Sequence, residues 1–191
     1  DGILFDPWLG QDPFAPKLVC TENCFSNVLF LPGLKASGLY KNGSSGTEDT
    51  LWPPNPFGND IAELGLDSNG TSYKTVYTRD AIDTVYGTEI YGDFLTQLSD
   101  LKTSRTIQDF EAFAYDWRQN VEDIVRDGTR YKGNVTKYPV SELAALADTS
   151  KSGKVTIIAH SNGGLLAKAL MLELEKQGKT ELVDKVILVG T

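Results

Sequence analysis

The stretch Val155-Thr-Ile-Ile-Ala-His-Ser-Asn-Gly-Gly164 decides the fold of this 191-residue chain. Its first four residues form an apolar run that favours a buried strand, and an apolar stretch at helical spacing follows over residues 164–177. Ser161 stands at the turn between them, with the small residues Ala159 and Gly163 two positions to either side. Because a strand and a helix that cross this closely leave no room for larger flanking side chains, we expect a tight turn with a positive φ at the serine.

Apolar strands alternate with amphipathic helices along the rest of the chain. Strands are expected in the apolar or alternating segments 28–31, 73–78, 110–115 and 186–189. Helices are expected where apolar residues recur at helical spacing, around residues 91–101, 121–125 and 140–147. Loops, irregular segments and a helix-ending glycine are expected at residues 41–46, 51–59, 151–154 and 178. Unbroken apolar strands separated by helices indicate an α/β fold, with a mostly parallel sheet and helices on both faces.

Composition and charge limit the classes of protein to which this chain can belong. The chain has 40% hydrophobic residues and a formal net charge of −8, so we expect a globular protein that is poorly suited to bind nucleic acid. No apolar run approaches the roughly 20 residues that a transmembrane helix needs. We interpret residues 1–26 as an extended lead-in or linker and residues 27–191 as part of one domain. The first residue is not a methionine, which is typical of a mature or excised segment.

The two cysteines, Cys20 and Cys24, lie four residues apart in the lead-in. This spacing favours a small disulfide loop, which would place the protein outside the cell or in another oxidising compartment. A zinc site is disfavoured because two thiols without nearby histidines make a poor set of ligands. The sequence therefore predicts no metal site and no cofactor.

Further landmarks accompany the serine in a fixed order. They are Asn-Val-Leu-Phe-Leu-Pro-Gly-Leu at residues 27–34, Leu51-Trp52, Ala-Tyr-Asp-Trp-Arg at residues 114–118, and Val-Ile-Leu-Val-Gly-Thr at residues 186–191. Together with the serine stretch, these segments resemble the lecithin:cholesterol acyltransferase family of α/β-hydrolases over residues 27–191. The tetrapeptide Tyr-Asp-Trp-Arg is the most specific of them. The resemblance implies an α/β-hydrolase fold whose C-terminal strands are missing from this chain.

The resemblance also implies a serine esterase, lipase, phospholipase or acyltransferase that acts on lipid-like esters. Ser161 matches the family nucleophile, at the turn called a nucleophile elbow, and would carry the acyl group as an acyl-enzyme. The backbone amides of Leu34 and Asn162 match the donors of the oxyanion hole, where rigid amides stabilise the negative charge of the transition state. Trp52 and Trp117 are interpreted either as walls of an acyl or alcohol pocket or as core residues.

The other members of a catalytic triad are not found in this chain. His160 is its only histidine, and as the neighbour of Ser161 it is expected to point away from the serine and to pack beside the sheet. In α/β-hydrolases the acid and the histidine follow the serine, so both are expected after Thr191, in the same or another chain. Asp116 is not the family's triad acid, and with Arg118 it is interpreted as a buried ion pair or loop anchor.

Two functions are consistent with these observations. In the first, Ser161 attacks an ester carbonyl with the help of a base that lies beyond this sequence. In the second, the chain is a non-catalytic module that uses a degenerate hydrolase fold for binding or assembly, since it has no usable histidine. An acid and a histidine after Thr191 would favour the first function. Residues 186–189 would then be an unprotected sheet edge in this chain taken alone, which is expected to be inactive.

Overall fold

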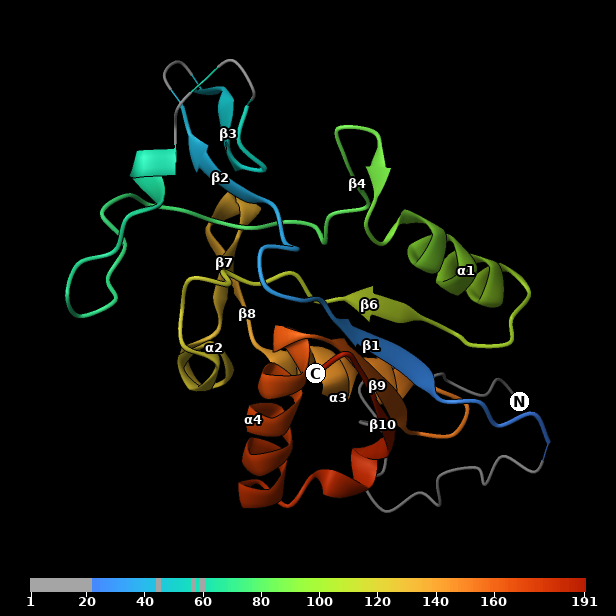
Figure 1. Cartoon of the computed structure of the whole chain (residues 1–191). Helices are drawn as coiled ribbons and strands as arrows, with labels where there is room; N and C mark the ends of the chain where they lie inside the picture. The colour runs from blue at the N-terminus through green and yellow to red at the C-terminus, as the bar shows by residue number, and fades with distance from the viewer. Residues whose placement is uncertain (1–21, 44–45, 56–57, 59–60) are drawn as a thin grey trace, which may run out of the picture.

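The computed structural model describes residues 22–43, 46–55, 58 and 61–191 (Figure 1). Its strands are β1 Asn27–Leu31, β2 Leu39–Asn42, β3 Glu48–Trp52, β4 Thr84–Val85, β5 Thr88–Glu89, β6 Phe110–Ala112, β7 Thr129–Tyr131, β8 Val135–Lys137, β9 Val155–His160 and β10 Val183–Val189. Its helices are α1 Gly92–Thr103, α2 Val121–Asp127, α3 Pro139–Thr149 and α4 Asn162–Lys176, with 3-10 turns at Ile61–Leu64, Lys132–Asn134 and Thr180–Leu182. Within the described ranges, no helix is both long and apolar enough to span a bilayer.

The lead-in 1–26 is described only from residue 22. Cys20 lies outside the described residues, and the proposed bond between Cys20 and Cys24 therefore stays a prediction. The compartment inferred from that bond stays a prediction as well.

The centre of the protein is a four-stranded parallel sheet in the order β10-β9-β1-β6. Within it Leu29 of β1 lies opposite Ile157 of β9 on one side and Glu111 of β6 on the other. Because the strands run in the same direction, their carboxyl ends meet at one edge of the sheet. The chain leaves β1 for β6 on one side and later returns to β9 on the other, so the order reverses at β1. Ligand sites in such sheets lie beside the carboxyl ends of the strands at this reversal.

Helices cover both faces of the sheet (Figure 1). α1 packs on one face beside β6, whereas α3 and α4 pack on the other face beneath β1 and β9, with α2 against them. Residues of β1 alternate between the two faces: Val28 packs in a cluster with Leu98 of α1, while Leu29 and Leu31 belong to the larger cluster with α3 and α4. A strand that is covered on both faces reads as a nearly continuous apolar run, as residues 28–31 do here. The predicted α/β fold with a parallel sheet is therefore confirmed.

The strongly periodic segments form the elements that the sequence predicts. The serine stretch spans β9 and α4, and the segments at residues 28–31 and 186–189 lie in β1 and β10. The end of α4 also agrees with the prediction, since Gly178 has a φ of 65°. Its N–H bonds to the Glu175 carbonyl at 3.1 Å, and the next N–H bonds to the Leu174 carbonyl at 2.8 Å. This pair of bonds is a Schellman motif, which satisfies the last carbonyls of the helix.

Short polar strands are where the sequence prediction is wrong. β2 and β3 form an antiparallel hairpin that includes residues 41–42, predicted as the start of a loop, and residues 51–52, predicted as the start of an irregular stretch. The hairpin forms because Leu39 and Leu51 are fully buried, while Lys41 and Asp49 pair across the strands at 3.7 Å. Residues 73–78 form no strand, only isolated bridges to two separate partners. The bridge partners, Tyr40 and Tyr131, are distant in the chain, so the local pattern does not specify these pairings.

The strand predicted at residues 110–115 is shorter than expected. β6 ends at Ala112, but Phe113, Ala114 and Tyr115 stay fully buried after the chain has left the regular ladder. An apolar run reports burial rather than strand pairing, and here burial continues beyond the strand. The tetrapeptide that follows therefore begins inside the core.

β10 lies at the edge of the sheet and is poorly covered. Among the described residues it has a strand neighbour on one side only, which is β9. The side chains of Val186, Ile187, Leu188 and Val189 are 38% to 56% exposed, although they alternate between the two faces. Both faces of this apolar strand are therefore open to solvent.

Candidate active site

Ser161 lies between β9 and α4 with a φ of 51° and a ψ of −124°. A positive φ is strained for any residue that carries a β-carbon, and the sequence predicts it for this turn. The Ser161 N–H donates to the Val189 carbonyl at 2.9 Å, which ties the turn to β10. A β-carbon at Gly163 would collide with the carbonyl of Leu31 and come within 2.8 Å of the Pro32 carbonyl oxygen. The predicted requirement for a small residue after the serine is thus explained by contact with the end of β1.

Ser161 lines a pocket of about 420 Å³ beside the carboxyl ends of β1 and β9. The pocket walls are mostly apolar and include Trp52, Pro53, Pro54, Ile82, Val85 and Ile90. Among the described residues that line it, Lys35 is the only one with a formal charge. A pocket of this size with few polar groups suits a ligand that has an uncharged apolar portion. The predicted site residues Ser161, Leu34 and Trp52 are brought together here.

The turn that follows β1, residues 33–36, lies directly against Ser161. A hydrogen bond of 3.2 Å onto the Gly33 carbonyl closes this turn, and Lys35 inside it has a φ of 62°. A β-carbon at Gly33 would lie 3.2 Å from the Ser161 Cβ, so turn and serine are in contact. Within the described part of the chain, neither the Leu34 N–H nor the Asn162 N–H donates to an acceptor. Both amides are therefore free to bind a ligand oxygen beside the serine.

Tyr91 joins the turn to the strand that carries the serine. Its phenol oxygen accepts a hydrogen bond from the Gly33 N–H at 2.9 Å and lies 2.8 Å from His160 Nδ1. Burial raises the pKa of the Tyr91 phenol, although the Gly33 N–H opposes this shift, so the phenol is protonated at neutral pH. His160 therefore faces Tyr91. No described residue forms a hydrogen bond with Ser161 Oγ, and no base for the serine is in place among them.

Tyr115 ties the same turn to the start of α4. Its phenol donates to the Pro32 carbonyl at 2.9 Å and accepts from the side-chain amide of Asn162 at 3.1 Å. Burial raises the pKa of Tyr115 to about 12, so the phenol remains a donor across the physiological range. The Asn162 side chain is thus occupied, which leaves its backbone amide as the group available beside Ser161.

The two predicted pocket tryptophans have different surroundings. Trp52 lines the pocket, and its indole N–H donates to the Lys35 carbonyl at 2.6 Å. Trp117 packs behind it, edge to face with ring centroids 5.5 Å apart, and donates to the Ser37 carbonyl at 3.1 Å. Trp117 is in contact with two core clusters rather than with the pocket. Trp52 lines the pocket and also packs against one of these clusters, so both interpretations fit it, whereas only the core interpretation fits Trp117.

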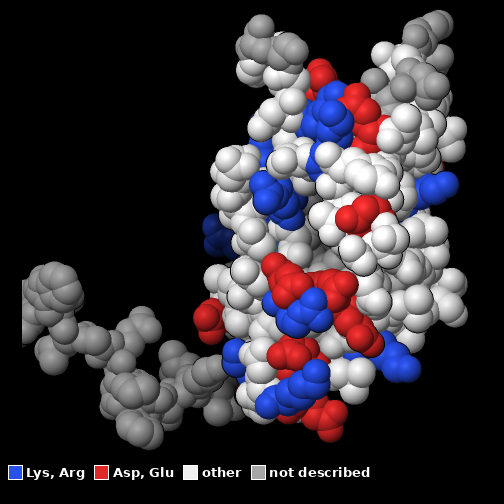
Figure 2. All heavy atoms as spheres, turned by 90° about the vertical axis from the view of Figure 1, so that its left-hand side faces the viewer, with Lys and Arg blue, Asp and Glu red and all other residues white. Residues whose placement is uncertain are grey.

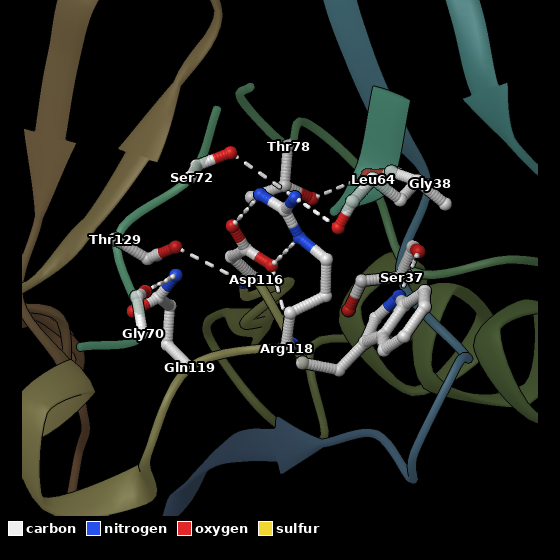
Figure 3. A network of polar contacts seen from close by, with 11 residues as sticks. Ser37, Gly38, Leu64, Gly70, Ser72, Thr78, Asp116, Arg118, Gln119 and Thr129 are labelled. Carbon is white, nitrogen blue, oxygen red and sulfur yellow. Dashed lines mark hydrogen bonds and ion pairs between the residues drawn. The ribbon is translucent and has the colours of Figure 1, made fainter. Parts of the chain in front are cut away.

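Asp116 and Arg118 form a bidentate ion pair, as the structural interpretation predicts (Figure 3). Arg118 Nη2 and Nε lie 2.6 Å and 2.8 Å from the two carboxylate oxygens, and the side chains are only 5% and 13% exposed. The guanidinium also donates to the Leu64 carbonyl and the Ser72 hydroxyl, while the Asp116 N–H donates to the Thr129 hydroxyl. The pair therefore anchors two outlying segments to the end of β6.

Replacement of Arg118 by methionine is expected to lower the free energy of unfolding by about 3–5 kcal/mol, because a buried carboxylate loses its partner. For a domain of this size, the melting temperature should fall by about 6–20 °C. Arg126→Met is a matched control, because Arg126 pairs with Asp123 while its side chain is 65% exposed, and its melting temperature should stay close to that of the wild type. A wild-type melting temperature for Arg118→Met would contradict the anchor.

A second hollow, of about 520 Å³, lies on the face that carries α2 and β7. Figure 2 shows this face, where basic and acidic side chains are interspersed. Arg126, for example, pairs with both Asp123 and Asp127 at 2.6 Å. Paired charges of both signs give little net attraction for a phosphate backbone. In the part of the chain that the structure describes, no group of three or more His, Cys, Asp or Glu side chains is placed to hold a metal ion.

Comparison with known proteins identifies no relative of this chain. No protein-family model, no curated protein and no solved structure matches the chain. The function therefore has to be argued from the geometry of the site.

The sequence pattern does not identify Tyr91 and Tyr115 as residues of this site. Tyr91 enters the sequence pattern as the first apolar member of a helix, and Tyr115 as the last residue of a strand. The available signal is weak: a buried tyrosine needs a partner for its hydroxyl, but the sequence does not name that partner. Here the partners are backbone groups of the turn after β1, which have no sequence signature.

Proposed function

We propose that this chain carries the nucleophile of a serine ester hydrolase or acyltransferase of the α/β-hydrolase type, acting on lipid-like esters. One observation carries the proposal: Ser161 is held at positive φ in an apolar pocket, beside two backbone amides without acceptors among the described residues. Such a conformation costs of order 1–3 kcal/mol and persists where the surroundings impose it, typically at functional sites. The start of α4 at Asn162 adds a partial positive charge next to the serine.

In the proposed reaction, Ser161 Oγ attacks the carbonyl carbon of the ester. The carbonyl oxygen becomes negative and is held by the N–H groups of Leu34 and Asn162. A general base takes the proton of Ser161 Oγ during the attack and gives it to the alcohol as the alcohol leaves. The acyl group then remains on Oγ until water or another alcohol removes it. The apolar wall that includes Trp52 would hold the acyl chain meanwhile.

The proposal requires a general base that the described residues do not supply. His160, the only histidine in the sequence, is engaged through Nδ1 by Tyr91. We therefore propose that the base and its acid partner lie outside residues 1–191, in the same or another chain. Activity is accordingly a property of the complete protein, and its tests belong there.

A fluorophosphonate probe tests the proposal on the complete protein. The probe phosphorus takes the place of the ester carbonyl carbon, and its oxygen needs the same two amides. We expect one covalent label, on the peptide that contains Ser161, and no label after heat denaturation. A label on a different serine would show that the nucleophile lies elsewhere.

A non-catalytic binding module is the second candidate, favoured by the absence of a described base at Ser161 Oγ. It predicts that a fluorescent fatty-acyl ligand binds in the apolar pocket while the probe leaves Ser161 unlabelled. Labelling of Ser161 in the complete protein would favour the enzyme over the binding module.

A further inference from the structure

We propose that Tyr91, oriented by His160, is a positioning residue that holds the turn of residues 33–36 in the geometry needed to bind the oxyanion. The inference rests on the proposed function, since it assigns the Leu34 amide to the transition state. It goes beyond that function because neither side chain needs to touch the substrate: Tyr91 acts through the Gly33 backbone.

The Tyr91 phenol is fixed by regular structure rather than by a loop. Tyr91 is the residue that precedes α1, and its carbonyl accepts the Leu95 N–H at 2.8 Å. Its own N–H donates to the Asp83 carbonyl at 3.1 Å. Its ring packs edge to face on Phe30 of β1, with centroids 4.8 Å apart and an interplanar angle of 81°. Helix and sheet therefore set the position of the phenol oxygen.

The phenol oxygen has two hydrogen-bond partners. The Gly33 N–H can only donate, so the oxygen accepts this bond of 2.9 Å. In the proposed arrangement the phenol donates its proton to His160 Nδ1 at 2.8 Å, and the ring proton of the imidazole lies on Nε2. Each bond in this chain strengthens the other, because donation by the phenol makes its oxygen a better acceptor. His160 thus orients Tyr91 toward the turn.

The turn depends on such an anchor. Its peptide units are consecutive, so the Tyr91 bond to the Gly33 N–H restricts rotation of the unit that carries the Leu34 N–H. Packing holds the two ends of the turn rather than its middle, because Gly33 and Ala36 are buried whereas Leu34 is 54% exposed and Lys35 adopts the left-handed φ of 62°. The Trp52 bond to the Lys35 carbonyl holds the other end of the turn. Loss of Tyr91 alone should therefore misplace the amide without unfolding the site.

The test compares rates of fluorophosphonate labelling and of ester hydrolysis in the complete protein. Tyr91→Phe keeps the ring and removes only the hydroxyl, so both rates are expected to fall by about 10-fold to 10²-fold, the effect of a misplaced catalytic group. The loss should appear in kcat with KM unchanged, because the amide acts on the transition state. Tyr131→Phe is the matched control: it removes a buried phenol that donates to the Ala114 carbonyl, remote from Ser161, and should leave the labelling rate unchanged.

Variants of His160 separate positioning from general stability. His160→Asn keeps an acceptor near the place of Nδ1 and should retain most of the rate, whereas His160→Leu should lose as much as Tyr91→Phe. The double variant Tyr91→Phe with His160→Leu should lose no more than either alone, since both act through one chain of bonds. If wild type is labelled at Ser161 and Tyr91→Phe reacts at the wild-type rate, the inference is wrong and the proposed function stands. If the wild-type protein is not labelled at all, both the inference about Tyr91 and the proposed function are wrong. Should Tyr91→Phe fail to fold, equal rates for His160→Asn and His160→Leu would overturn the inference.

Discussion

Ser161→Ala is expected to lower ester hydrolysis by the complete protein by about 10⁶-fold, the effect of removing the nucleophile from a triad that acts as a unit. The alanine keeps Cβ and the strained turn but has no oxygen to form the acyl-enzyme. Residual turnover would come from the pocket and the two free amides alone. The measurement is the steady-state hydrolysis of a p-nitrophenyl ester, with fluorophosphonate labelling alongside.

Ser99→Ala is the matched control for this experiment. Ser99 is an exposed serine of α1, on the helix that covers the opposite face of the sheet from α4. Its replacement should leave hydrolysis and labelling at wild-type levels. Equal turnover by Ser161→Ala and wild type would exclude Ser161 as the nucleophile and favour the non-catalytic module.

Gly163→Ala is expected to destabilise the protein by about 3 kcal/mol, at the upper end of the cost of overpacking, because the clash is with backbone rather than with a flexible side chain. The added Cβ would meet the Leu31 and Pro32 carbonyls, so α4 has to move away from β1. For a domain of this size, the melting temperature should fall by about 6–12 °C. Labelling of Ser161 should fall as well, since the serine moves with the helix.

Gly164→Ala provides the comparison within the same helical turn. The three atoms nearest to its added Cβ all belong to the side chain of Thr191, which is exposed and has to shift to make room. The helix also gains about 1 kcal/mol in propensity when glycine is replaced by alanine, at either position. Gly164→Ala should therefore melt well above Gly163→Ala. Equal melting temperatures for the two variants would contradict the packing of α4 on β1.

Much of the fold could be predicted because burial leaves a periodic trace in the sequence. β1 and β9 are covered on both faces and are mostly apolar, and α1 and α3 repeat apolar residues at helical spacing. The hairpin of β2 and β3 could not be predicted, because residues such as Lys41 and Asn42 are polar and show no apolar alternation, so their strand conformation depends on pairing with β3. The local sequence pattern predicts well which residues are buried, but it predicts poorly which strands pair.

The candidate site could be predicted in part, for a similar reason. Small residues around Ser161 follow from the close crossing of strand and helix, and the structure shows the crossing. The tetrapeptide at residues 115–118 is a landmark in the sequence, but the contacts that its side chains make are seen only in the structure. Tyr115 bonds to the turn after β1, Trp117 supports the pocket wall, and Arg118 anchors outlying segments. All of these contacts go to backbone groups or to residues far away in the chain, which sequence spacing does not record.

The exposed edge at β10 has a consequence for how residues 1–191, as an isolated piece, behave in solution. An open parallel edge is a template for any extended chain, and Val-Ile-Leu-Val at residues 186–189 has no charge, proline or glycine to deter stacking. The nearest charges, Asp184 and Lys185, neutralise each other at 3.4 Å. Native molecules can therefore associate without unfolding first. Soluble protein should be lost from a stored sample of residues 1–191 at a rate that increases with protein concentration. Dilution should therefore reduce this loss more than a stabilising substitution in the core does.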